Sequence, residues 1–334
     1  MGLLGKLRRQ HMLHTKLRPF EKENAARQFS ADDTISLFVN PRGGSTWLAE
    51  LLLHIPRTVM AIEPLFRGRF STVDPLPPGH KKGLEEVRDL GFWFYQHVPD
   101  DAEWPEAKAF MHRLFNRQKM ALSIWYQNEL AEIPSASTFL FKLCYGQLML
   151  PWLADQFDMK NVLLVRHPCA VVASQLNFGD AWARIKEHPQ FPVPQCKFNE
   201  IFERHHEALA AVHTPAENLA AMWAVTMRNT IYHPNNNKKW LTVSYEHLLC
   251  EPEKQLIRIC EYLGREVPET ALEQIKRPSK TSSDGVIASD QLSKWKTDLS
   301  EDQIRRILAM IERFDIDLYT RSEFPQESIL YGSP

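Results

Sequence analysis

Five short apolar runs bounded by turn residues alternate along the chain with segments of helical spacing. The runs are residues 35–39, 58–62, 139–143, 162–165 and 240–244. Helical apolar spacing follows them at residues 46–55, 147–157, 169–176 and 253–263. Because neighbouring parallel strands require a crossover connection, strands that alternate with helices favour a parallel sheet covered on both faces. The pattern predicts a three-layer α/β fold with a mainly parallel central sheet.

The length of 334 residues accommodates one large domain with insertions. We expect a basic N-terminal arm at residues 1–30, a single domain at residues 31–320 and a C-terminal tail at residues 321–334. Two mainly helical stretches, at about residues 67–134 and 179–220, interrupt the alternation. Since ligands of open α/β sheets bind at the carboxyl ends of the strands, we expect these insertions to form the substrate side of a pocket there.

Charge and cysteine content disfavour several classes of protein. The chain has 40 basic and 41 acidic residues, so its net charge of -1 gives no general attraction to nucleic acid. Five widely spaced cysteines without a Cys-x-x-Cys pair indicate reduced thiols rather than a disulfide framework or a zinc site. No apolar run reaches the roughly 20 residues of a membrane helix. We therefore expect a cytoplasmic protein with no nucleic-acid partner and no integral membrane segment.

The first twenty residues contain five Lys or Arg and no acid. Their leucine spacing is compatible with a basic amphipathic helix that lies on a membrane surface. The segment lacks the apolar core of a signal peptide, and Lys6 departs from the myristoylation pattern. A solvated arm is the favoured interpretation, with peripheral membrane association as the alternative.

The sequence VNPRGGSTW follows the first apolar run and has the layout of a phosphate-binding loop. Gly43 and Gly44 permit positive φ and close backbone approach, and the free N–H groups at the start of the next helix point at an anion. Ser45 and Thr46 add hydroxyl donors, and Arg42 adds a permanent planar cation. Ser45 stands where the lysine of a nucleoside triphosphatase loop belongs.

A second strand-to-helix junction, VRHPCAVVAS, also suits an anion. The apolar run ends at Arg166, Pro168 fits a first helical turn, and Ser174 lies about two turns beyond the arginine. Arg166 supplies a fork of donors and Ser174 a hydroxyl, so the two can converge on a second anion. Two such turns at the ends of two strands in one sheet favour an anion-binding site over purely structural junctions.

These two segments resemble the motifs of sulfotransferases that use 3′-phosphoadenosine 5′-phosphosulfate (PAPS). In that family a Pro-[Arg/Lys]-Ser-Gly-[Ser/Thr]-[Ser/Thr] loop holds the 5′-phosphosulfate, and a Val-Arg-[Asp/His]-Pro…Ser element holds the 3′-phosphate. NPRGGSTWL and LVRHPCAVVAS match both in order and spacing, except that Gly43 stands where Ser is usual. The resemblance implies a fold like that of P-loop NTPases and in-line transfer of a sulfuryl group from PAPS to a hydroxyl or amine of a small-molecule or carbohydrate-like acceptor.

The resemblance covers roughly residues 34–315 and also implies nucleotide contacts. Trp47 takes the place of an aromatic residue that stacks on adenine, and Tyr245 takes that of a tyrosine beside the base. A loop that closes over the nucleotide supplies two further candidates. The residues expected to bind PAPS are Arg42, Gly43, Gly44, Ser45, Thr46, Trp47, Arg166, Ser174, Tyr245, Lys280 and Ser283. Near this last loop, Trp295 either belongs to the site or only packs.

Four residues are candidates for catalysis. Arg42 stands where charge grows on the bridging oxygen as the nucleotide leaves. Glu63 ends the second run, where several branches of the family carry a glutamate that is the proposed base in some of them. His97 is the alternative base, since the cytosolic branch uses a histidine after the loop. Lys142 ends the third run, where the family often has a lysine near the reacting groups. We favour Glu63 over His97, although Glu63 can also serve only to pair with Arg42.

The acceptor side is expected in the first insertion. Its aromatic residues either line an acceptor pocket or pack in the core; they are Phe92, Trp93, Phe94, Tyr95, Trp125 and Tyr126. Two other functions stay open: a P-loop nucleotide kinase or NTPase, and a non-catalytic nucleotide-binding protein. We expect no metal, since the sequence has no convincing cluster of carboxylate, His or Cys ligands. The oligomeric state is open, with a homodimer as one possibility.

Overall fold

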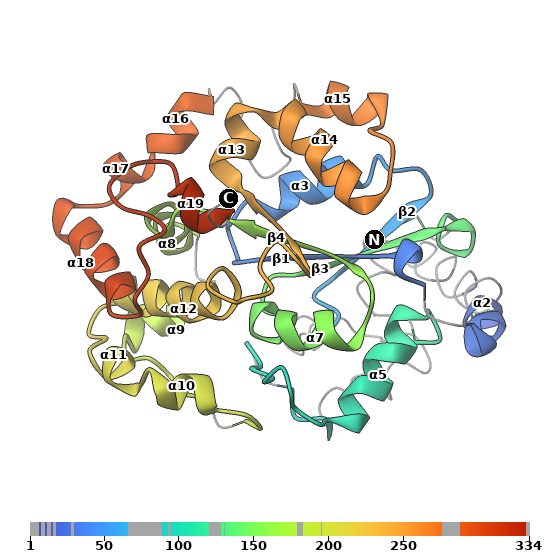
Figure 1. Cartoon of the computed structure of the whole chain (residues 1–334), viewed down its shortest axis with the longest axis horizontal. Helices are drawn as coiled ribbons and strands as arrows, with labels where there is room; N and C mark the ends of the chain where they lie inside the picture. The colour runs from blue at the N-terminus through green and yellow to red at the C-terminus, as the bar shows by residue number, and fades with distance from the viewer. Residues whose placement is uncertain are drawn as a thin grey trace.

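A parallel sheet of five strands forms the centre of the protein (Figure 1). The computed structural model describes residues 18–27, 30–65, 89–92, 95–119, 128–129, 131–178, 183–194, 196–275 and 288–331, and residues 7, 11 and 15. The strands are β1 (Thr34–Val39), β2 (Thr58–Ile62), β3 (Thr138–Leu143), β4 (Lys160–Val165) and β5 (Leu241–Ser244). Their order across the sheet is β2-β3-β1-β4-β5, and all pairs are parallel. The predicted α/β fold is confirmed.

The burial of each strand follows from its place in the sheet. All six residues of the central strand β1 are buried, whereas the edge strand β2 alternates between buried and half-buried positions. A strand covered by helices on both faces needs no polar alternation. Leu37 of β1 pairs with Lys142 of β3 and with Val162 of β4. The carboxyl ends of these three strands therefore meet at one edge of the sheet.

Helices cover both faces of the sheet (Figure 1). One layer packs against Leu37 and consists of α3 (Ser45–Leu52), α13 (Tyr245–Cys250), α14 (Pro252–Leu263) and α15 (Glu269–Ile275). The opposite layer packs against Phe38 and contains α5 (Pro105–Phe115), α7 (Leu150–Gln156), α8 (Pro168–Leu176), α12 (Pro215–Thr230) and α18 (Glu301–Glu312). Leu37 and Phe38 are neighbours on β1, so their side chains enter the two cores from opposite faces.

The remaining helical elements are short. The α-helices are α2 (Arg18–Glu23), α9 (Ala183–Glu187), α10 (Glu200–Arg204), α11 (His206–Ala210), α16 (Ala288–Ser293), α17 (Trp295–Asp298) and α19 (Glu327–Leu330). The 3-10 helices are η2 (Asn24–Ala26), η3 (Ala31–Asp33), η5 (Ile133–Ser135) and η6 (Gln147–Met149). None of the described helices is long and apolar enough to cross a membrane.

Two long helices of the second layer begin at capping boxes. In α12 the side chain of Thr214 accepts a hydrogen bond from the backbone of Glu217, and the Glu217 carboxylate accepts one in return. In α18 the Ser300 side chain accepts a hydrogen bond from the Gln303 backbone, and the Gln303 side chain accepts one from the Ser300 backbone. These reciprocal bonds satisfy N–H groups that a helix start otherwise leaves free. Both helices therefore start with satisfied N–H groups.

The C-terminal residues pack against the domain. Leu330 of α19 is buried, and its carbonyl oxygen accepts hydrogen bonds from the side chains of Asn236 and Asn237, at 3.3 and 2.8 Å. The Tyr331 hydroxyl lies 3.1 Å from Nδ1 of His247, beside the first turns of α13. The described part of the segment expected as a tail is thus folded onto the body of the protein.

Candidate active site

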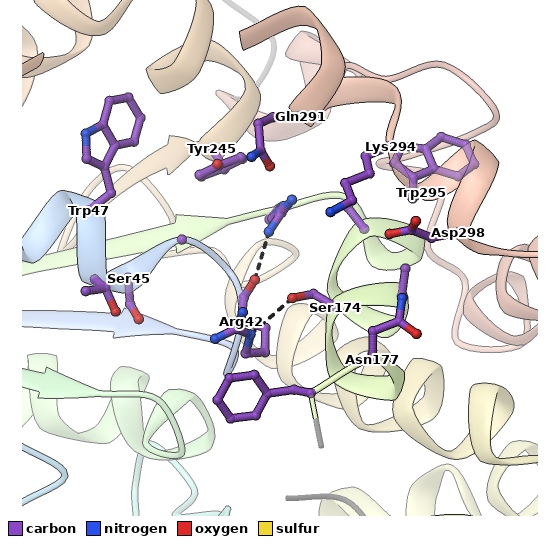
Figure 2. Close-up of a pocket in the computed structure, with 16 residues that line it drawn as sticks. Arg42, Ser45, Trp47, Ser174, Asn177, Tyr245, Gln291, Lys294, Trp295 and Asp298 are labelled. Carbon is purple, nitrogen blue, oxygen red and sulfur yellow. Dashed lines mark hydrogen bonds between the residues drawn. The ribbon is translucent and has the colours of Figure 1, made fainter. Parts of the chain in front are cut away.

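A pocket of about 310 Å³ opens at the carboxyl ends of β1 and β4 (Figure 2). It lies between the loop after β1, the turn after β4, α8 and the segment α16–α17. Eight residues predicted to bind the nucleotide line it: Arg42, Gly44, Ser45, Thr46, Trp47, Arg166, Ser174 and Tyr245. Gly43 is buried in the same loop, and Lys280 and Ser283 lie outside the described residues. Sequence motifs about 130 residues apart thus meet in one cavity.

The loop after β1 is held by a hydrogen bond to α12 and another from α8. Asn40 Nδ2 donates to Thr226 Oγ1 at 3.0 Å, and Gln175 Nε2 donates to the Pro41 carbonyl oxygen at 2.9 Å. Gly44 is the N-cap of α3, has no side-chain cap and adopts a φ of 92°. The N-terminal N–H groups of α3 are therefore directed at the pocket, where the helix dipole favours an anion.

Both glycines of the loop are required by close packing. A Cβ atom on Gly43 would approach Val39 Cγ2 to 2.7 Å and the Asn40 carbonyl oxygen to 2.8 Å. A Cβ atom on Gly44 would lie 2.3 Å from the Tyr245 ring. Contacts below 3 Å require the neighbours to move. The tight turn of this chain therefore explains why Gly43 stands where the sulfotransferase motif usually has serine.

Two guanidinium groups face the pocket. Arg42 donates from Nε to Ser174 Oγ at 3.1 Å, and Arg166 donates from Nη1 to the Arg42 carbonyl oxygen at 3.0 Å (Figure 2). The Arg42 guanidinium also lies 4.1 Å from the ring centroid of Phe178. The Arg166 guanidinium lies 4.4 Å from the ring centroid of Tyr245. Burial lowers the pKa of Arg42, and the charge of Arg166 lowers it further. Two adjacent cations in a partly buried pocket attract a ligand with more than one anionic group.

Two aromatic rings form one wall of the pocket. Trp47 and Tyr245 meet edge to face, with ring centroids 6.3 Å apart and an interplanar angle of 73°. Trp47 is 8% exposed, and among the described residues its Nε1 has no hydrogen-bond partner. Apolar faces with a polar edge suit a planar base.

Glu63 and Lys142 lie together behind the hydroxyl end of the loop. The Glu63 N–H donates to the Lys142 carbonyl oxygen at 2.8 Å, and the Cys144 N–H donates to Oε1 of Glu63. Lys142 Nζ donates to Thr46 Oγ1 at 3.2 Å. Glu63 is 4% exposed and has a φ of 50°, a left-handed conformation that is unusual for glutamate. The second and third strands thus deliver a carboxylate and an ammonium group to the edge that holds the loop.

His97 contacts the second insertion, at Phe198 and Glu200. Its Nδ1 is 3.3 Å from the Phe198 carbonyl oxygen and 3.8 Å from a carboxylate oxygen of Glu200. Burial lowers the pKa of His97, which is 7% exposed. These partners come from a different part of the chain than the glycine loop, so the structure does not group His97 with Arg42 and Ser174 as it groups the other motif residues.

The sulfotransferase domain family matches residues 32–314, which is most of the chain. The chain belongs to the sulfotransferase family. The expected family, the sulfotransferase activity and the enzyme class are therefore confirmed, and the nucleotide kinase or NTPase alternative is not supported. No curated protein sequence matches the chain.

Three solved structures are similar to this sulfotransferase. A sulfotransferase domain from a Synechococcus olefin synthase is 20% identical with a TM-score of 0.47, and the match covers 88% of this chain and 98% of that one. A mouse sulfotransferase complexed with PAP is 14% identical with a TM-score of 0.40, covering 90% and 89%. A retinol dehydratase in a complex with retinol and PAP is 18% identical with a TM-score of 0.39, covering 91% and 88%.

The segment α16–α17 adds pocket residues that the sequence motifs did not indicate. Gln291, Lys294 and Asp298 line the side opposite Ser45 (Figure 2). Trp295 holds this segment in place, because its ring stacks on His167 at 4.5 Å with an interplanar angle of 13°. The sequence offered the clue of a Trp-Lys pair near a nucleotide loop, but the lysine before Trp295 lines the pocket, not the one after it.

The aromatic residues of the first insertion are described only in part. Phe92 is buried and packs against Trp104, with ring centroids 5.0 Å apart. Tyr95 is also buried and meets Tyr145 edge to face at 5.1 Å. Trp93, Phe94, Trp125 and Tyr126 lie outside the described residues. For Phe92, packing in the core is the interpretation that the structure supports.

A metal site is not formed within the part of the chain that the structure describes. No group of three or more His, Cys, Asp or Glu side chains there could hold an ion. The five cysteines are free thiols.

Proposed function

We propose that this sulfotransferase transfers the sulfuryl group of PAPS to a hydroxyl or amine of a small-molecule or carbohydrate-like acceptor. The observation that carries the proposal is the pair of guanidinium groups in one pocket, where Arg166 donates to the Arg42 carbonyl oxygen and Arg42 donates to the Ser174 hydroxyl. PAPS has anionic groups at its 5′ and 3′ ends, and each arginine comes from a different strand end. A ligand with a single phosphate would use only half of this arrangement.

Each part of the nucleotide has a matching part of the site. The loop and the start of α3 would hold the 5′-phosphosulfate through Arg42 and free N–H groups. Arg166 and Ser174 would hold the 3′-phosphate, and the adenine would lie against Trp47 and Tyr245. Lys294 lines the same cavity and would add a third cation.

The proposed reaction is an in-line displacement at sulfur. The acceptor oxygen or nitrogen forms a bond to sulfur while the bond from sulfur to the bridging oxygen breaks, and adenosine 3′,5′-bisphosphate (PAP) leaves. Such transfers have loose transition states, so positioning and charge stabilisation account for most of the catalysis. Arg42 would stabilise the charge that grows on the leaving phosphate, and one such donor contributes about 3 kcal/mol. Lys142, bonded to Thr46, would support that end of the loop.

Glu63 is the proposed base that takes the acceptor proton. Its carboxylate accepts a hydrogen bond from the Cys144 N–H, which fixes the orientation of the carboxylate. The thiol of Cys144 stays protonated, because burial and the charge of Glu63 raise its pKa. A protonated thiol does not compete with Glu63 for the proton of the acceptor.

The test of the nucleotide assignment is a binding comparison. The affinities of the protein for PAP and for ATP with magnesium are measured by calorimetry, and we expect PAP to bind more tightly by at least about tenfold, since only PAP carries both phosphate positions. Tighter binding of ATP would refute the proposal. Screening hydroxylated and amine metabolites with labelled PAPS then identifies the acceptor.

The five free thiols support a reducing, cytoplasmic location.

A further inference from the structure

The carboxylate of Glu246 is buried beneath the nucleotide pocket with three hydrogen-bond donors. Its Oε1 accepts from the His167 N–H at 2.9 Å, and its Oε2 accepts from Ser244 Oγ and from the Tyr319 hydroxyl, both at 2.8 Å. Glu246 is 2% exposed, and its three partners are buried as well. The proposed reaction gives this carboxylate no role.

Glu246 connects the two walls of the pocket. His167 follows Arg166 in the turn after β4, and Tyr245 directly precedes Glu246 at the start of α13. The Arg166 guanidinium lies 4.4 Å from the centroid of the Tyr245 ring, and both side chains line the pocket. The Glu246 carboxylate therefore bonds to the backbone next to Arg166, and Glu246 itself is the residue that follows Tyr245. This connection fixes the distance between the two walls.

The third donor comes from the C-terminal segment, beyond the residues that match the family. The match ends at residue 314, whereas Tyr319 donates to Glu246 and the Thr320 carbonyl oxygen lies 3.0 Å from Nε2 of His167. Burial raises the pKa of Glu246, and the hydrogen bonds oppose this rise. A buried carboxylate is costly unless its oxygens are fully bonded, so all three partners are needed to keep it in place.

We propose that Glu246, together with Tyr319, is a positioning residue that holds Arg166 against the Tyr245 ring, in the geometry that recognises the 3′-phosphate of the nucleotide. The inference rests on the proposed function, since it assumes this nucleotide in the pocket. An arginine recognises a phosphate through a rigid fork of donors, so a small shift of the turn after β4 weakens this contact more than any contact of the 5′ end.

Glu246→Gln removes the charge and preserves the shape. The His167 N–H requires an acceptor, so the amide oxygen stays on that side and the NH₂ group faces the two hydroxyls. The hydroxyls of Ser244 and Tyr319 can rotate to accept from it. Tyr319→Phe is the milder variant, because it removes one donor while Ser244 remains on the same oxygen.

The experiment compares the affinities for PAP and adenosine 5′-monophosphate (AMP), which lacks the 3′-phosphate, by calorimetry. We expect Glu246→Gln to weaken PAP binding about tenfold and AMP binding by less than about twofold, the difference expected for one hydrogen bond to a charged group. Tyr319→Phe should weaken PAP binding about threefold for the same reason. The ratio of the two affinities is the readout, since a general loss of stability does not change it.

Glu217→Gln is the matched control. The Glu217 carboxylate is also buried and accepts hydrogen bonds from the N–H groups of His213 and Thr214, at 3.0 and 2.9 Å, but it caps α12 away from the pocket. This variant should lower the melting temperature and keep the affinity ratio of the parent. If Glu246→Gln and Tyr319→Phe behave like this control, the positioning role is overturned and the proposed function stands. If the parent itself binds PAP no better than AMP, both proposals fail.

Discussion

Arg42 Nε donates a hydrogen bond to Ser174 Oγ at 3.1 Å, which joins the loop after β1 to the helix after β4. The two residues are expected to contact opposite ends of PAPS, the phosphosulfate and the 3′-phosphate. The Ser174 hydroxyl accepts from Arg42 and can at the same time donate its own proton to a bound 3′-phosphate, because a hydroxyl is both donor and acceptor. Occupation of one end of the nucleotide site therefore influences the arginine at the other end.

Ser174→Ala tests the role of this hydroxyl. We expect the Kd of PAP to rise about tenfold, since one hydrogen bond to a charged phosphate is lost, while the Kd of AMP stays within about twofold of the parent. Calorimetry with both nucleotides provides the measurement. An equal loss for PAP and AMP would show that Ser174 acts through the loop and not on the 3′-phosphate.

Arg42 and Arg166 should separate into a catalytic and a binding role. Arg42→Ala should lower kcat by about 100-fold to 1000-fold, because the donor that stabilises the leaving phosphate is gone. Arg166→Ala should mainly weaken PAP binding, with a smaller effect on kcat at saturating PAPS. Initial rates with labelled PAPS and calorimetry give the two quantities. Unchanged PAP binding by Arg166→Ala would remove the 3′-phosphate assignment.

Glu63→Gln tests the base. The rate should fall by about 100-fold, within the usual range for general bases, while PAP affinity changes less than about twofold. His97→Asn is the comparison, and it should retain nearly the parent rate because His97 bonds to Phe198 of the insertion. A normal rate in Glu63→Gln together with a large loss in His97→Asn would assign the base to His97.

Lys294 should contribute to nucleotide affinity, although no motif indicated it. Lys294→Ala should raise the Kd of PAP about threefold at low salt and less at high salt, since an exposed cation is screened. Lys296→Ala is a matched control, because Lys296 pairs with Glu323 and does not line the pocket. Equal effects of the two substitutions would indicate a general charge effect on the segment.

The strands and the positions of the two turns that carry Arg42 and Arg166 could be predicted because their signals are local. Thr58–Ile62 and Thr138–Leu143 read as strands from their own composition, and Arg42 and Arg166 stand at fixed offsets from strand ends. The topology of a parallel sheet then brings those ends to one edge without any further information. These parts of the fold and of the site follow from neighbouring residues alone.

Contacts between distant residues account for what the sequence did not predict. Lys294 is an exposed lysine in a polar segment, and it reaches the pocket because Trp295 stacks on His167, which is 128 positions earlier in the chain (295 − 167). The requirement for glycine at position 43 depends on the approach of Val39 and Asn40, which no motif specifies. His97 was a candidate by residue type, but its place depends on packing against Phe198.

His167 should make the stability of the protein depend on pH. Its Nδ1 accepts a hydrogen bond from the Cys169 N–H at 3.1 Å, and its Nε2 lies 3.0 Å from the Thr320 carbonyl oxygen, so the ring is neutral with its proton on Nε2. Burial lowers the pKa of His167 to about 4. An unfolded histidine titrates near about 6.5, so the unfolded chain binds more protons between these two values. The stabilising contribution is complete above the unfolded pKa and is lost as the pH falls toward the folded one.

The expected loss is about 1.4 kcal/mol per pH unit across that window, the value for one proton taken up on unfolding. Urea unfolding of the parent and of His167→Asn, measured at several values between about pH 7 and pH 5, provides the test, because asparagine caps a helix but does not titrate. His97 and His205 also have pKa values lowered by burial, and they contribute equally to both proteins. The His167→Asn variant should have a lower free energy of unfolding than the parent near neutral pH. Its free energy of unfolding should also change less with pH, by about 1.4 kcal/mol per pH unit. Parallel curves for the two proteins would mean that His167 already accepts a proton in the folded state, against the hydrogen bond at its Nδ1.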